Sequence, residues 1–164
     1  MFFGVYAAAT AAFPPKENDI LSLSVEDAYK QTAVGINVFA AGQAAITHFR
    51  DPVHKNHPKA FIVTGNLLPF SQVAPVNFFT LGIQKTIAAR FIANAANAYY
   101  AADGVKYYFA SLVSKEGGFV DYQSEFAKSG STHAEVYWGL INGEEQEDWD
   151  YRYVLWSTFF PVRS

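Results

Sequence analysis

Lys85 follows Leu81 by four residues, in the stretch Leu81-Gly82-Ile83-Gln84-Lys85. Residues with this spacing lie one turn apart on the same face of a helix. Lysine carries an ionisable amine, whereas leucine has no proton to give. Lys85 therefore provides an amine, and the residue one helical turn before it, Leu81, provides no proton donor.

A second set of ionisable residues lies in the last third of the chain. It comprises Asp121, Glu125, His133 and Glu135. His133 could act as an acid or a base, because imidazole titrates close to neutral pH. The alternative is that these residues form a solvated polar face. We keep His133 as a candidate catalytic residue beside that alternative.

Three histidines, His48, His54 and His57, surround Asp51 near the end of a predicted helix. Imidazole and carboxylate groups are metal ligands. The spacing is irregular, however, and the chain has no cysteine. Histidines at a helix C-terminus are also favoured by the helix dipole. The sequence therefore predicts surface histidines and no metal site.

The bulk composition excludes several classes of protein. Hydrophobic residues make up 51% of the 164 residues and charged residues 16%, which indicates a folded domain with a core. The net charge of −3 gives no electrostatic basis for binding nucleic acid. No apolar run approaches the ~20 residues of a membrane span. The apolar N-terminus lacks the basic region of a signal peptide and leads into Pro14-Pro15. We expect a soluble, cytoplasmic protein.

Apolar stretches at residues 2–9, 59–65 and 105–110 predict buried strands. Between them, residues 25–49 and about 78–102 predict two long helices rich in alanine and other small residues. This order of strands and helices is typical of a parallel α/β sheet with right-handed crossovers.

The helix ends and the later elements are predicted from local patterns. Ser24 followed by Asp27 suggests an N-terminal cap, and Gly104 suggests a C-terminal one. Residues 131–142 predict a short amphipathic helix, the acidic residues 144–150 a solvated loop, and residues 153–160 a last strand. The fold class is therefore α/β, with a parallel sheet of about four strands in a partial Rossmann-like three-layer sandwich.

Several motifs along this framework resemble the second half of the short-chain dehydrogenases/reductases, over residues 2–112. The resemblance is to a divergent, mostly fungal branch of that family. The motifs are Thr64-Gly65-Asn66, Leu81 to Lys85, Tyr107-Tyr108-Phe109 and His133 to Trp138, with Gln146 and Trp149. The whole chain, 1–164, would then be one truncated domain, with a core of residues 1–112. Residues 113–164 would correspond to the substrate cap and the last strand.

The resemblance implies roles for individual residues. Asn37 and Lys85 match the asparagine and lysine of the catalytic tetrad. Asn66, or Gly65 in a shifted register, takes the serine position, and Leu81 replaces the tyrosine that transfers the proton. No Gly-rich dinucleotide motif is present in the sequence. We expect no cofactor, and NAD or NADP only if a missing N-terminal half is supplied.

Three functions remain open. The first is a dehydrogenase-like protein that cannot carry out ordinary hydride transfer. The second is a cofactor-free isomerase, cyclase or dehydratase, with an apolar metabolite held between residues 113–140 and Asn37, Asn66 and Lys85. The third is a non-catalytic partner. The helices at 25–49 and 78–102 match those that the family uses for dimerisation, so we expect a homodimer. A second route to association is an apolar sheet edge at residues 5–9.

Overall fold

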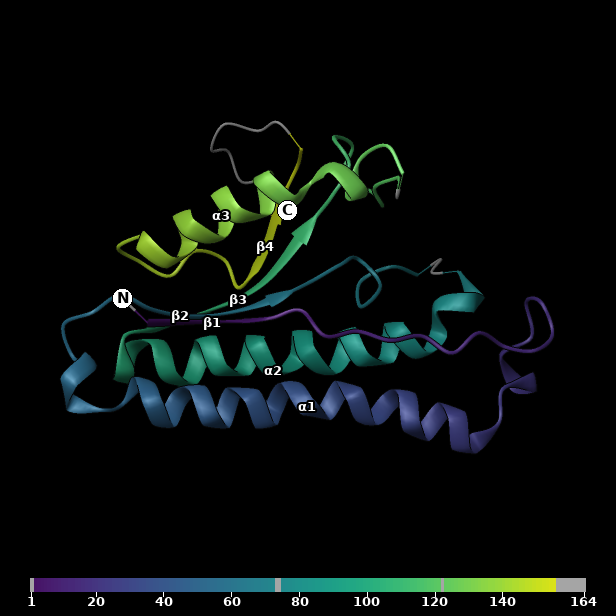
Figure 1. Cartoon of the computed structure of the whole chain (residues 1–164), viewed down its shortest axis with the longest axis horizontal. Coiled ribbons are helices and arrows are strands. Elements are labelled where there is room, and N and C mark those ends of the chain that lie inside the picture. Colours follow the sequence, from purple (N-terminus) through teal and green to yellow (C-terminus); the bar gives the residue numbers. More distant parts are fainter. Residues whose placement is uncertain (1, 73–74, 122, 156–164) are drawn as a thin grey trace.

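The computed structural model describes residues 2–72, 75–121 and 123–155 (Figure 1). The chain folds as an α/β sandwich whose sheet has four parallel strands in the order β1-β2-β3-β4. The strands are β1 (Phe2–Tyr6), β2 (Lys59–Thr64), β3 (Val105–Leu112) and β4 (Asp150–Tyr153). The helices are α1 (Val25–Phe49), α2 (Phe79–Asp103) and α3 (Gly130–Asn142). The predicted fold class is confirmed. No helix in the described ranges is both long and apolar enough to cross a membrane.

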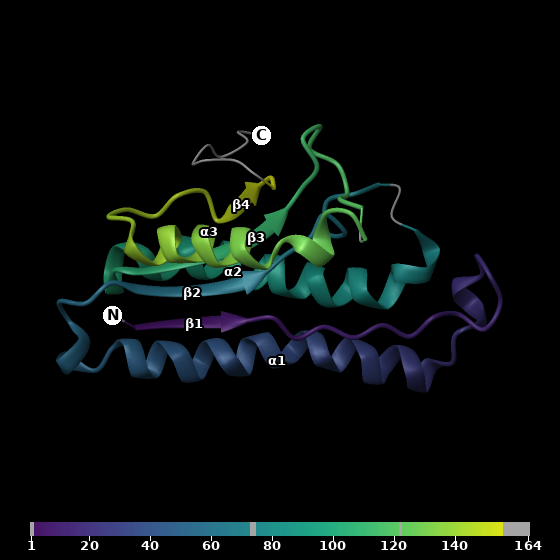
Figure 2. The same cartoon turned by 45° about the horizontal axis from the view of Figure 1, so that its top comes forward.

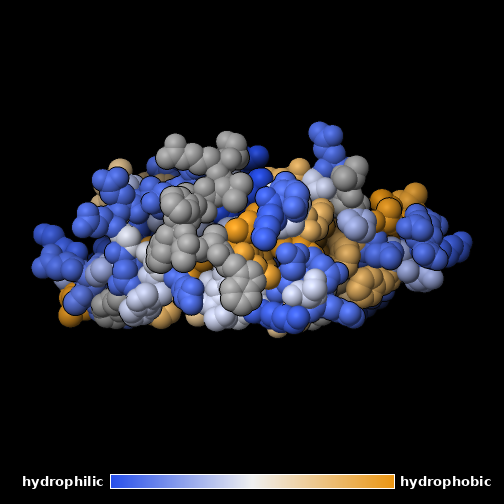
Figure 3. All heavy atoms as spheres, turned by 90° about the horizontal axis from the view of Figure 1, so that it is seen from above, coloured by the Kyte–Doolittle hydropathy of each residue, from blue (hydrophilic) through white to orange (hydrophobic). Residues whose placement is uncertain are grey.

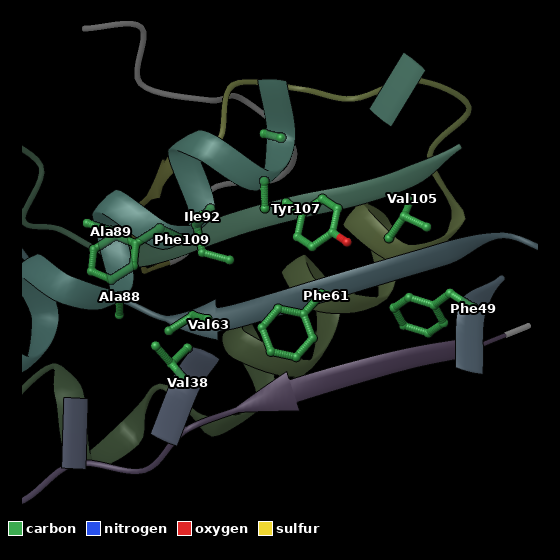
Figure 4. Close-up of a cluster of buried hydrophobic side chains, with 12 residues drawn as sticks. Val38, Phe49, Phe61, Val63, Ala88, Ala89, Ile92, Val105, Tyr107 and Phe109 are labelled. Atoms are coloured by element: carbon green, nitrogen blue, oxygen red, sulfur yellow. The ribbon is translucent and has the colours of Figure 1, made fainter. Parts of the chain in front are cut away.

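The sheet is covered on both faces, with α1 and α2 on one side and α3 on the other (Figures 1 and 2). Side chains alternate along a strand. The odd-numbered residues of β2 and β3, such as Phe61 and Phe109, pack against α1 and α2 (Figure 4). The even-numbered ones, such as Ile62 and Tyr108, pack against α3. Burial on both faces explains why these strands are continuous apolar runs in the sequence.

The two long helices end where the local sequence predicts. Ser24 accepts a hydrogen bond from the Asp27 backbone N–H at 3.0 Å, and Gly104 ends α2 in the left-handed conformation, with φ of 62°. The helices approach closely because Gly35 lies against the backbone of Gln84 and Gly42 lies under the ring of Phe91. A side chain at either glycine would separate the helices.

The last connection differs in geometry from the first two. All three run between neighbouring strands in the same direction across the sheet, but α3 covers the opposite face from α1 and α2. The β3–α3–β4 connection therefore has the opposite hand. One consequence is that the strand ends near β2 and β3 receive side chains from α2 on one face and from α3 on the other.

The last strand is shorter and earlier than predicted. The sequence predicts a strand over 153–160, but β4 covers Asp150–Tyr153, and residues 156–160 lie outside the described residues. The predicted position was wrong because Asp150 belongs to the acidic stretch 144–150, whose charge is typical of a solvated loop. In the structure Arg152 pairs with Asp150 at 2.6 Å along the same face of the strand. Similarly, the first strand ends at Tyr6 rather than at residue 9.

Strand β1 lies at one edge of the sheet and pairs only with β2 among the described strands. Its Phe3 and Val5 side chains are 51% and 45% exposed. Beyond β1 the extended chain is held by α2. Gln84 bonds to both the N–H and the C=O of Thr10, and Thr80 bonds to the N–H of Ala12.

Candidate functional site

Lys85 lies at the carboxyl end of the sheet, where parallel α/β proteins bind their ligands. Helix α2 places it with 6% of the residue exposed. Its Nζ donates a hydrogen bond of 2.6 Å to the carbonyl oxygen of Thr64, the last residue of β2. Burial lowers the pKa of Lys85 to about 8. At neutral pH the amine is therefore partly unprotonated and able to accept a proton.

Leu81 precedes Lys85 by one turn of α2 and is partly buried. Its two polar neighbours on the helix, Thr80 and Gln84, are bonded to the backbone of residues 10–12. The turn of α2 before Lys85 therefore contributes an apolar side chain and no proton donor to the site.

Asn66 lies two residues beyond the end of β2. Its Oδ1 accepts a hydrogen bond of 3.0 Å from the backbone N–H of Leu68, which closes a local turn. The preceding residue, Gly65, cannot carry a side chain, because a Cβ there would lie 2.7 Å from the ring of Phe109 and would also meet Ser111 Oγ. Of the two positions that the sequence offers for the serine, only Asn66 can present a polar side chain.

The side chain of Tyr137, on α3, reaches the same strand end from the other face. The hydroxyl of Tyr137 lies 2.9 Å from Thr64 Oγ1. His133 lies one turn earlier on α3, with its ring centre 5.8 Å from that of Tyr137. Its Nδ1 lies 2.8 Å from the carbonyl oxygen of Ser129. A carbonyl only accepts hydrogen bonds, so Nδ1 carries a hydrogen and the lone pair of the neutral ring is on Nε2.

Tyr153, on β4, completes this group. Its ring centre lies 5.5 Å from that of His133, and its buried hydroxyl interacts with the hydroxyl of Tyr137. Burial raises the pKa of both Tyr153 and Tyr137.

Thr64 therefore joins the two halves of the site. Its carbonyl oxygen holds Lys85 and its hydroxyl contacts Tyr137. Of the residues expected from the sequence, Lys85 contacts this strand end, Asn66 follows it by two residues, and His133 lies one turn before Tyr137 on α3. Tyr137 and Tyr153 were not among the candidate site residues expected from the sequence. The spacing of four residues between His133 and Tyr137 could have pointed to Tyr137.

Asn37 does not join this group through any described contact. It is exposed on α1, and its side chain makes no hydrogen bond to another described residue. The buried stripe of α1 consists of Gly35, Val38, Gly42 and Phe49. Asn37 lies outside this stripe, on the solvent side of the helix.

The other polar clusters have local structural roles. The ring of His54 lies 4.6 Å from that of His48 and 6.5 Å from that of His57. Even so, no group of three His, Cys, Asp or Glu residues within the described ranges is placed to hold a metal ion. Asp121 accepts hydrogen bonds from Ser124, and Glu125 accepts one from the Asp121 backbone, so both carboxylates close a turn.

The face that carries α3 exposes apolar residues near its middle, with hydrophilic residues around them (Figure 3). Two apolar grooves, with volumes of about 440 and 780 Å³, lie elsewhere, on the solvent side of α1 and α2. Neither groove is lined by Lys85 or Asn66. The candidate site residues and the two apolar grooves thus lie at different places on the molecule. Comparison of the sequence with protein-family models and with curated proteins gives no match.

Proposed function

We propose that this chain is a relative of the short-chain dehydrogenases/reductases that performs acid–base chemistry on a small apolar carbonyl compound, without hydride transfer. The observation that carries the proposal is the contact of buried Lys85, one turn after a leucine, with the carbonyl oxygen of Thr64, whose hydroxyl contacts Tyr137.

The order of elements supports the relationship. The chain runs strand, helix, strand, helix, strand, helix, strand, with Asn66 after the second strand and Lys85 on the second helix. These are the positions at which the family's motifs match this sequence. Leu81 argues against ordinary carbonyl reduction, because general acid–base catalysis contributes about 10²- to 10⁴-fold and leucine supplies none.

The lack of a dinucleotide-binding motif also argues against hydride transfer. The sequence has no Gly-rich turn of the kind that binds a pyrophosphate at a helix N-terminus. Binding of NAD or NADP would require a phosphate-binding turn that residues 1–164 do not contain. Lys85 on its own offers a single point charge and no phosphate-binding loop.

The side chains that are present suit proton transfer. Unprotonated Lys85 can remove a proton from the carbon next to a carbonyl group. The hydroxyl of Tyr137 or the amide of Asn66 can hydrogen-bond to the carbonyl oxygen as negative charge develops on it. Return of the proton to another carbon would isomerise the compound. An apolar substrate fits Leu81 and the aromatic side chains of α3 and β4.

The direct test is exchange of carbon-bound protons. The protein is incubated in D₂O with small ketones and aldehydes such as cyclohexanone and heptanal, and loss of the α-proton signals is followed by NMR. Lys85→Met should slow the catalysed exchange by about 10²- to 10⁴-fold. Tyr137→Phe should slow it by about tenfold, the equivalent of one hydrogen bond. Lys115→Met, at an exposed position, is the matched control and should keep the full rate.

Saturable binding of NADPH, followed by its oxidation with a carbonyl compound, would contradict the proposal. It would show that hydride transfer survives without the family's tyrosine and without its phosphate-binding turn.

A second role, association with another copy of the chain, is supported by the solvent side of α1 and α2. The two grooves there meet at Thr86 and Ile87, and Arg90 is the only charged residue among their described lining residues. Residues 31–47 of α1 contain no charged residue.

The exposed area of this surface is close to that of a dimer interface. Six of its apolar side chains are 37–55% exposed: Ile20, Ile36, Phe39, Phe78, Phe79 and Tyr99. Together they expose roughly 500 Å², the larger part of the ≈ 800 Å² per partner of a standard interface. We infer a homodimer through α1 and α2, in which each copy covers the grooves of the other.

A further inference from the structure

We propose that Lys85 acts as a covalent catalyst, whose amine adds to the carbonyl carbon of an apolar aldehyde or ketone and forms an iminium ion. This proposal rests on the proposed function and names its chemical step and its class of substrate.

Three lysines are buried among the described residues: Lys59, Lys85 and Lys106. Lys59 donates to the carbonyl oxygen of Asp103, at the end of α2, and Lys106 donates to those of Ile141 and Gly143, at the end of α3. Carbonyl oxygens at helix C-termini carry partial negative charge and favour a cation. These two lysines therefore cap the C-termini of helices, although burial lowers the pKa of Lys106.

Lys85 lacks this support. Its one hydrogen bond to a described residue goes to a carbonyl oxygen at a strand end, and no carboxylate of the described residues forms an ion pair with it. A buried amine whose ammonium form is poorly stabilised is the kind of lysine that proteins use as a nucleophile.

Two hydroxyl groups meet at Thr64, the residue whose carbonyl oxygen holds Lys85. Forming an iminium ion requires a proton at two stages, because the carbonyl oxygen is first protonated and then leaves as water. Thr64 Oγ1 and the Tyr137 hydroxyl lie 2.9 Å apart at the residue that holds Lys85. His133 follows Tyr137, with a free lone pair on Nε2 in its neutral form.

The step balances as follows. The lone pair of Nζ attacks the carbonyl carbon, and a C–N bond forms as the C=O π electrons move to oxygen. Nζ loses a proton and the oxygen gains one, which gives a carbinolamine. The hydroxyl group then takes a proton from solvent through Tyr137 and leaves as water. A neutral amine, a carbonyl compound and one proton thus give an iminium ion and one water molecule.

Trapping tests this step directly. The folded protein is mixed at pH 7 with a limiting amount of propanal and with cyanoborohydride, which reduces an iminium ion to a stable secondary amine. Peptide mapping by mass spectrometry then gives the alkylation rate of every lysine. Lys85 should react on the order of ten- to a hundredfold faster than the exposed Lys30 and Lys115, because more of its amine is unprotonated.

Two controls separate reactivity from exposure. In urea the preference for Lys85 should disappear, because it depends on burial. Lys85→Arg keeps a cation that can donate to Thr64 but cannot form an iminium ion, and its circular dichroism spectrum shows whether the fold is retained. Alkylation of the exposed lysines should be unchanged in that variant.

The outcomes distinguish the two proposals. If Lys85 is alkylated no faster than Lys30, the iminium step is overturned, and proton exchange in D₂O that persists in that case leaves acid–base chemistry in place. If Lys85 is trapped selectively but the protein catalyses no exchange, the covalent step stands and the proposed function fails.

Discussion

The contact between Lys85 and Thr64 decides the energetics of the candidate site. A buried ammonium group loses its hydration and regains one hydrogen bond, to the carbonyl oxygen at the end of β2. The pKa of about 8 corresponds to a cost of about 3 kcal/mol for keeping the group charged in the folded state. The fold tolerates this cost at a position where an apolar side chain would pack, which supports a chemical role for the amine.

Replacing this amine should change how stability depends on pH. The pKa of Lys85 is lower in the folded state than its ordinary value of 10.5, so the unfolded chain binds more protons between about pH 8 and 10.5. The free energy of unfolding of the wild type therefore rises through that window. Relative to Lys85→Met, the wild type should gain about 2 kcal/mol between pH 7 and pH 9.5.

Urea denaturation of both proteins at the two pH values measures this gain. Titration of the tyrosines and of the other lysines is common to both and cancels in the difference. Lys115→Met serves as the control and should follow the wild type at both values, because its side chain is exposed. Parallel behaviour of the wild type and Lys85→Met would show that the amine is not buried as described.

At the scale of elements, helix α2 does two things at once. One face packs into the core through residues such as Ala88, Ala89 and Ile92. Its first turns hold the chain beyond β1, where Gln84 bonds to both backbone groups of Thr10 as a neighbouring strand would. The helix that carries Lys85 is thereby fixed on two sides.

Loss of the two hydrogen bonds between Gln84 and Thr10 should loosen the chain beyond β1 and leave the sheet intact. In Gln84→Leu the N–H and C=O of Thr10 lose their partners. Amide hydrogen exchange at Thr10 should accelerate by about tenfold or more, because each hydrogen bond contributes about 1 kcal/mol. The amide of Ile62, in β2, should keep its protection. The control is Gln43→Leu, at an exposed position on α1, and acceleration in both variants would refute a specific role for Gln84.

At the scale of the whole molecule, the apolar solvent side of α1 and α2 predicts association. Phe39 is 50% exposed and lines the larger groove. An aspartate there would bring a charge into the interface of each copy and should convert the inferred dimer to a monomer at micromolar concentration. Val53→Asp is the control, because Val53 is 68% exposed but lies outside both grooves. Sedimentation velocity distinguishes the species, and a monomeric wild type would rule out the dimer.

The elements and the fold class could be predicted from the sequence because their causes are local. Ser24 and Gly104 cap helices through bonds and backbone angles within a few residues. The apolar runs of β2 and β3 follow from burial on both faces. The last strand was misplaced because its charges, on Asp150 and Arg152, neutralise each other only once they lie on the same face beside β3.

The candidate site also has features that the sequence predicts and features that only the structure shows. The sequence by itself determined that an amine follows a leucine on a helix and that Asn66 follows a strand. Only the tertiary structure decided that Tyr137 and Tyr153 join them and that Asn37 does not. The physical reason is that α3 crosses to the opposite face of the sheet, which brings the hydroxyl of Tyr137 to Thr64, 73 positions away in the sequence. Contacts over such separations depend on the packing of layers, which no local pattern encodes.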